Sequence, residues 1–128
     1  MIILNDKRFN DEKFHFVKNL EAIKKSPNNS TLIFNYKESD IDLYRFCQKN
    51  SIEYGVKISS IKEFIFLINL GAKYCFCDTL KLAKKLQKIA DNYLSETKVI
   101  LISSLNRIEK VALNEIDGII LDIFSKEI

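Results

Sequence analysis

The chain has 128 residues, of which 47% are hydrophobic and 29% are charged, and its formal net charge is +3. This length predicts one domain spanning 1–128 with a substantial core, and these fractions argue against disorder. The charge is too small to indicate a nucleic-acid or membrane partner, and with only 3 glycines the chain has no long glycine-rich binding loop.

The cysteines and the apolar runs bear on where the protein works. Three cysteines, an odd number without the spacing of a disulfide framework, favour a reducing cytoplasm. The apolar start of the chain is too short for the core of a signal peptide. The longest apolar run, 64–70, is interrupted by Asn69 and is far shorter than the ~20 residues that cross a bilayer. We therefore expect a cytoplasmic protein without a membrane partner.

Strand and helix signals alternate along the chain. In the first half we predict a strand at 2–4, a helix over 11–25, a strand at 31–36, a helix from Asp40 and a strand at 53–58. In the second half we predict a helix from Ser60 to Gly71, a strand at 74–77, a helix from Thr79, a strand at 98–102, a helix from Ser104 and a strand at 118–124. The helix over 11–25 is based on Phe16, Leu20 and Ile23, which recur at helical spacing.

An internal repeat connects the two stretches that open at Ser59 and Ser103, at a constant offset of 44 residues. The first stretch ends at Asp78 and the second at Asp122, and their apolar positions coincide. Each copy is typical of a serine-capped helix followed by a buried strand that ends on an aspartate. Two successive strand–helix units therefore make up one period.

Several strands are apolar on consecutive residues, as at 99–102 and 119–121. Such runs are typical of parallel strands that helices cover. The sequence predicts a single three-layer α/β domain, flavodoxin-like or receiver-like, with a mainly parallel sheet of five or six strands and helices on both faces. A half (βα)-barrel is the alternative, because the repeat also fits that architecture and a whole barrel needs roughly 200 residues.

Polar residues follow the strands at the end of a parallel sheet where ligands usually bind. The candidate ligand-binding residues are Ser59, Asp78, Ser103, Ser104 and Asp122. An aspartate directly after an apolar strand suits a metal ligand, an acid or base, or a phosphoryl acceptor. Helix capping is the alternative explanation for the serines, and hydrogen bonds from loop N–H groups are the alternative for the aspartates.

The order of these residues resembles that of response-regulator receiver domains, over most of the chain from Thr31 onward. The resemblance implies metal-binding acids at Glu38 and Asp40, a phosphoryl acceptor at Asp78, a hydroxyl at Ser103 or Ser104 and a lysine at Lys126. The chain departs from the receiver pattern in several respects, and one of them is an extra predicted helix before Thr31. The two acids are not adjacent at the end of the strand, and no proline follows Lys126.

Other catalytic patterns are absent from the sequence. His15 is the only histidine, so histidine-based triads and multi-histidine metal sites are excluded; we place it in the first helix, partly packed. The chain has no glycine-rich nucleotide-binding motif and no nucleophile elbow. Cys47, Cys75 and Cys77 fall on apolar faces, where cysteine acts as a small hydrophobic residue. We therefore predict no catalytic residue, no metal and no cofactor.

One helix carries a basic stripe formed by Lys81, Lys84, Lys85 and Lys88. We interpret the stripe as a solvated face rather than as a nucleic-acid surface, because single-stranded nucleic-acid binders add exposed aromatic residues. The helix offers only Tyr93, which falls on its apolar side. A nucleic-acid partner is therefore not expected.

We expect a small cytoplasmic interaction or regulatory domain without catalytic activity. The run 64–68 is apolar nearly all round its helix, so that one face is available to bury against a protein partner or a second copy. The alternative is a small-ligand or phosphate-binding protein, such as a degenerate receiver-like or half-barrel enzyme, that uses the carboxyl ends of the strands.

Overall fold

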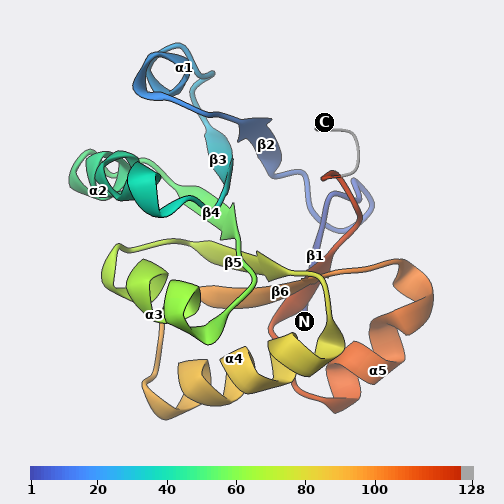
Figure 1. Cartoon of the computed structure of the whole chain (residues 1–128). Coiled ribbons are helices and arrows are strands. Elements are labelled where there is room, and N and C mark those ends of the chain that lie inside the picture. The colour runs from blue at the N-terminus through green and yellow to red at the C-terminus, as the bar shows by residue number, and fades with distance from the viewer. Residues whose placement is uncertain (125–128) are drawn as a thin grey trace.

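The computed structural model describes residues 1–124 and has one curled sheet with helices on its outside (Figure 1). The strands are β1 (Ile2–Leu4), β2 (Lys13–Phe16), β3 (Ser30–Asn35), β4 (Tyr54–Lys57), β5 (Tyr74–Cys77), β6 (Lys98–Ile102) and β7 (Gly118–Ile120). The helices are α1 (Leu20–Lys24), α2 (Ile41–Lys49), α3 (Ile61–Asn69), α4 (Leu80–Asn92) and α5 (Ile108–Leu113). Short 3-10 turns, Glu38–Asp40 and Leu105–Arg107, precede α2 and α5.

The sheet is parallel throughout, with the order β1-β7-β6-β5-β4-β3-β2. Strands β2 to β7 follow one another in sequence order, and β1 adds to the far side of β7. The predicted parallel α/β architecture is confirmed, but the sheet has seven strands rather than five or six. Its sequential order and its curl make it a half-barrel, which is the alternative that the repeat suggested.

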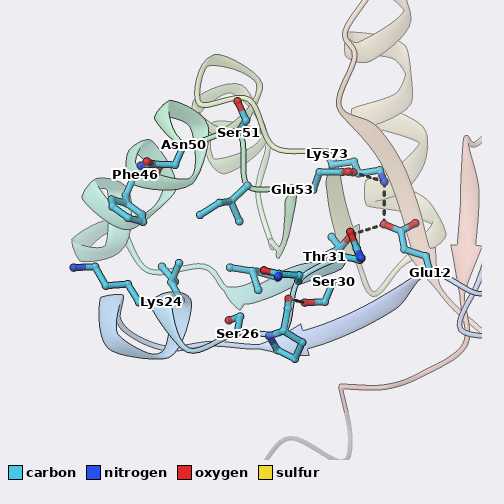
Figure 2. A pocket seen from close by; sticks show the side chains of 16 residues that line it. Glu12, Lys24, Ser26, Ser30, Thr31, Phe46, Asn50, Ser51, Glu53 and Lys73 are labelled. Carbon is cyan, nitrogen blue, oxygen red and sulfur yellow. Dashed lines mark hydrogen bonds and ion pairs between the residues drawn. The ribbon is translucent and has the colours of Figure 1, made fainter.

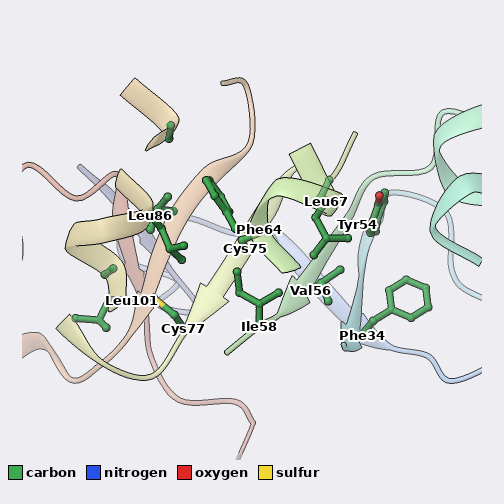
Figure 3. Packing of buried hydrophobic residues seen from close by; sticks show 14 of the residues in the cluster. Phe34, Tyr54, Val56, Ile58, Phe64, Leu67, Cys75, Cys77, Leu86 and Leu101 are labelled. Carbon is green, nitrogen blue, oxygen red and sulfur yellow. The ribbon is translucent and has the colours of Figure 1, made fainter. Parts of the chain in front are cut away.

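The two faces of the sheet bury different residues. In β5, Cys75 and Cys77 pack in an outer cluster with the helices, whereas Tyr74 and Phe76 pack in an inner cluster. Figure 3 shows the outer cluster, where Phe64 and Leu86 lie over the sheet. All five described helices contribute buried residues to the outer cluster and none to the inner one. The helices therefore cover one face of the sheet, because right-handed crossovers between successive neighbouring strands lie on the same side.

The strand that the sequence did not predict is β2, which lies within the segment 11–25 where a helix was predicted. That prediction was wrong in its first half, because half-buried Phe14 and Phe16 alternate with exposed Lys13 and His15 on an edge strand. The helix begins only after Asn19, whose side chain accepts a hydrogen bond from the backbone N–H of Ala22 at 2.8 Å. His15 accordingly lies exposed on β2 rather than within a helix.

The last strand is shorter than predicted, ending at Ile120 rather than at 124. Beyond it, the carboxylate of Asp122 accepts a hydrogen bond from the backbone N–H of Phe124 at 2.8 Å, which turns the chain out of the strand. The ring of Phe124 then packs in the inner cluster, 5.6 Å from the ring of Phe16 and 5.4 Å from that of Phe76. The chain after β7 thus packs into the concave side of the sheet.

The 44-residue repeat corresponds to two structural copies, β4-α3-β5 and β6-α5-β7. In the first copy Ser60 caps α3 by accepting the backbone N–H of Glu63 at 3.2 Å, and Gly71 takes the left-handed φ of +76° after the helix. In the second copy Ser104 makes no side-chain cap bond, and a 3-10 turn begins the helical segment. None of the described helices is long and apolar enough to span a bilayer.

Candidate functional site

The parallel strands bring the predicted site residues to one end of the sheet, but local hydrogen bonds engage most of them. The hydroxyl of Ser59 donates to the carboxylate of Glu63 at 3.4 Å. Ser103 is buried, and its hydroxyl donates to the carbonyl oxygen of Ser104 at 3.1 Å. Ser104 in turn donates to the side chain of Asn106. Together with Asp122, which holds the turn after β7, these groups stabilise their own loops.

Asp78 forms an ion pair with a residue of a neighbouring strand. Its carboxylate lies 3.5 Å from the ammonium group of Lys57, which ends the neighbouring strand β4. The same ammonium group lies 5.5 Å from the centre of the Phe124 ring. An ion pair with its side chains partly exposed contributes little to stability, so its position at the mouth of the half-barrel matters more than its strength.

Sequence reasoning missed Lys57, although the alternation of β4 contains a signal for it. Val56 faces the helices, so Gly55 and Lys57 face the concave side of the sheet. A lysine on the concave side at the carboxyl end of a barrel strand is placed where such folds bind their ligands.

A hollow of about 230 Å³ lies beside this lysine, at the carboxyl ends of β2 and β3. We call it the β2–β3 hollow, and its lining residues are Phe16, Val17, Lys18, Ile33, Asn35, Lys37 and Asp40. Asn35 is the register partner of Lys57, so the hollow and the Lys57–Asp78 pair share one rim of the sheet. The sequence marked this rim as the ligand-binding end, although most of the lining residues were not among its candidates.

A larger hollow, about 840 Å³, opens at the opposite end of the sheet, between α1 and α2 (Figure 2). Beside it, the carboxylate of Glu12 accepts hydrogen bonds from Thr31, from Lys73 at 3.0 Å and from Tyr74 at 2.6 Å. Lys73 also pairs with Glu53 at 2.5 Å. Burial raises the pKa of Glu12, but these hydrogen bonds outweigh it and hold the pKa below its ordinary value. Because these polar groups are paired with one another, we interpret them as groups that stabilise the fold at this end of the sheet.

Two of the three acids of the receiver resemblance lie in separate ion pairs, and the third, Asp40, lines the β2–β3 hollow. Glu38 pairs with Lys62 at 3.5 Å, whereas Asp78 pairs with Lys57. Within residues 1–124, no three His, Cys, Asp or Glu side chains gather into a group that could hold a metal ion. The acidic cluster that the resemblance implies is therefore not assembled, and Lys126 lies outside the described residues.

All three cysteines are buried without disulfides, as the sequence predicted for Cys47, Cys75 and Cys77. Burial raises the pKa of the Cys47 thiol to about 11 and that of Cys77 to about 12. Thiols with pKa values this high are poor nucleophiles and poor metal ligands at neutral pH.

A second candidate site lies on the outer face of the helices, where apolar side chains remain exposed. On α3, Ile61 and Ile65 are 37% and 44% exposed, and Ile68 continues their face at helical spacing. Ile68 lines a hollow of about 570 Å³ together with Tyr93 and Leu94, which follow α4. We call these five residues the α3–α4 surface. Tyr93 was expected on the apolar side of its helix, but it is 78% exposed.

The exposed side of α4 is basic. Ala83, Leu86 and Ala90 face the core, which leaves the predicted stripe of Lys81, Lys84, Lys85 and Lys88 exposed to solvent. Helices α3 and α4 are neighbours on the outside of the sheet (Figure 1). An exposed apolar face thus lies on the helix next to a basic one.

No protein-family model matches the chain, and no curated protein matches it with significant similarity. Its function must therefore be inferred from its own residues and geometry.

Proposed function

We propose that the protein is a cytoplasmic, non-catalytic interaction domain that binds an acidic, partly apolar protein segment along the α3–α4 surface. The observation that carries this proposal is the exposure of Ile61 and Ile65 on a helix that lies next to α4, the helix that carries the lysine stripe. Contiguous exposed apolar side chains rimmed by polar ones are typical of protein-binding surfaces.

The charge of the neighbouring helix supports an acidic partner. Lys84 and Lys88 are exposed on α4, and they have no ion pair among the described residues. A partner with apolar side chains against Ile65 and carboxylates against these lysines would bury the isoleucine and neutralise the charges of the lysines. The state of the rim supports the absence of catalysis, because its serines bond within their own loops and the ring of Phe124 fills the concave side.

Site-specific photo-crosslinking in cells tests this proposal. A photo-reactive residue replaces Ile65 in one variant and Leu113 in a control, because Leu113 is an exposed apolar residue on a different helix, α5. We expect a discrete crosslinked protein from position 65 and none from position 113.

The purified partner should then bind the wild-type chain, and bind the Lys84→Glu/Lys88→Glu variant at least about tenfold more weakly, with affinity falling as salt rises. The proposal would be overturned by equal crosslinked products at positions 65 and 113, or by a binding affinity that changes neither with salt nor in the lysine variant. A crosslink to nucleic acid or to a second copy of the chain would overturn the proposal of an acidic protein partner and would identify the crosslinked molecule as the partner.

A further inference from the structure

We propose that the β2–β3 hollow binds a small organic anion, in which a carboxylate or phosphate group is attached to a compact apolar body. This site is separate from the α3–α4 surface and does not depend on the function proposed there. The hollow lies at the carboxyl ends of parallel strands, which is the end where α/β sheets bind their ligands.

The floor of the hollow is apolar. Ile33 and Val17 are buried, and Phe16 is half-buried on the edge strand β2. The volume of about 230 Å³ is below the ~300–1,000 Å³ typical of drug-sized ligands, so the hollow suits a small molecule. Covering the half-buried ring of Phe16 with an apolar body would release the water that now contacts it.

The rim of the hollow carries groups that suit an anion. Lys18 and Lys37 line it, and neither ammonium group has an ion pair within residues 1–124. Asn35 also lines it, and this residue is exposed at the end of β3. The lining contains two lysines and one aspartate, Asp40, so the rim has a net positive charge.

The neighbouring strand extends this rim. Lys57 is the register partner of Asn35, so a third ammonium group follows along the same end of the sheet. Its ion pair with Asp78 is long, at 3.5 Å, and both side chains retain access to solvent. An anion held at Lys18 and Lys37 therefore has the Lys57–Asp78 ion pair, whose charges balance, as its neighbour along this rim.

A titration of the ¹⁵N-labelled chain, followed by NMR chemical shifts, tests the site with four probes. Phenyl phosphate and benzoate combine an anion with an apolar body, inorganic phosphate lacks the body, and benzylamine reverses the charge. We expect saturable shifts at residues 16–18 and 33–37 with phenyl phosphate or benzoate, weaker binding of inorganic phosphate and no saturation with benzylamine. Tighter binding of phenyl phosphate would indicate a phosphate-selective site, and tighter binding of benzoate a carboxylate-selective one.

Two variants make the test specific. Lys18→Ala/Lys37→Ala should weaken the binding of the anionic probe by about tenfold or more, which is the loss of affinity expected for one charge-assisted hydrogen bond. Lys49→Ala/Lys110→Ala, which removes one exposed lysine from α2 and one from α5, should leave the affinity unchanged. Equal shifts with benzylamine, shifts that never saturate, or equal effects of the two lysine pairs would overturn the proposal. Inorganic phosphate binding as tightly as phenyl phosphate would overturn the apolar part of it.

Discussion

The hydroxyl of Tyr74 donates a hydrogen bond to the carboxylate of Glu12 at 2.6 Å, across 62 positions of the sequence. Tyr74 begins the central strand β5, whereas Glu12 directly precedes the edge strand β2. Lys73 and Thr31 donate to the same carboxylate. The edge strand β2 is therefore tied to the centre of the sheet by one partly buried acid, at the end opposite to the carboxyl ends of the strands.

Replacing Glu12 should lower the stability of the fold. We expect Glu12→Gln to reduce the free energy of unfolding by about 1–3 kcal/mol, because an amide cannot accept the same three charge-assisted bonds. Urea denaturation followed by circular dichroism measures the loss. Glu109→Gln, at an exposed position on α5, is the matched control and should change stability by less than about 0.5 kcal/mol. Equal effects of the two substitutions would contradict the role given to Glu12.

The same carboxylate predicts a dependence of stability on pH. The pKa of Glu12 is lowered in the folded chain from an ordinary value of 4.5. A depressed pKa contributes stability at pH values above the unfolded pKa, and that contribution is lost as the pH falls through the folded pKa. The difference in urea midpoint between wild type and Glu12→Gln should therefore be largest near neutral pH and narrow below about pH 4.5. A difference that stays constant down to pH 3 would contradict the pKa shift.

Most of the parallel architecture could be predicted from the sequence, because most of the strands from β3 onward contain runs of apolar residues between segments with helical spacing. Strand β2 could not, because Phe16 lies at helical spacing from Leu20 and Ile23 as well as in strand alternation with Phe14. Four residues at a sheet edge give too short a pattern to decide between the two periods. The curl of the sheet depends on the order of the strands in space, which local patterns do not encode.

The candidate site was only partly predictable, for a related reason. The sequence correctly marks the carboxyl ends of the strands, but it does not show whether a polar side chain is used locally or faces a hollow. Ser59 and Ser103 are used locally. Lys57 faces inward, and it escaped notice because lysine on a short strand is usually taken as a solvated end. Its significance depends on the curl, which turns that face of β4 into the inside of a half-barrel.

Gly55 should be intolerant of any side chain. A Cβ atom at this position would lie 2.6 Å from Cε2 of the Phe76 ring, which packs over β4 on the inner face. We expect Gly55→Ala to destabilise the fold by about 1–3 kcal/mol through overpacking. The double variant Gly55→Ala/Phe76→Leu should lose less than the sum of the two single changes, because the smaller side chain leaves room for the methyl group. Additive losses in urea denaturation would show that the two positions do not share this space.

The buried thiols should be protected from modification in the folded chain. Burial raises the pKa of Cys47 to about 11 and that of Cys77 to about 12, and it raises the pKa of the fully buried Cys75 as well. The thiolate is the reactive form, so Ellman's reagent at pH 8 should modify the folded chain slowly, at a rate set by unfolding. In denaturant all three thiols should react at once. Fast reaction of any one thiol in the native chain would show that its site opens without unfolding.

Phe124 should hold the concave side of the half-barrel closed, although it lies beyond the last strand. Its ring is 8% exposed and packs edge-on against Phe16, which joins the turn after β7 to the opposite edge of the sheet. Phe124→Ala should lower the free energy of unfolding by about 2–4 kcal/mol, somewhat less than a fully buried phenylalanine, because solvent can fill part of the space. Leu113→Ala, at a residue that is 84% exposed, is the control and should stay within about 0.5 kcal/mol of wild type.

NMR spectra of Phe124→Ala should show the largest shifts at Phe16, Phe76 and Lys57, which contact the ring. Shifts confined to the neighbours of residue 124 in sequence, with unchanged stability, would mean that the inner cluster closes without this side chain.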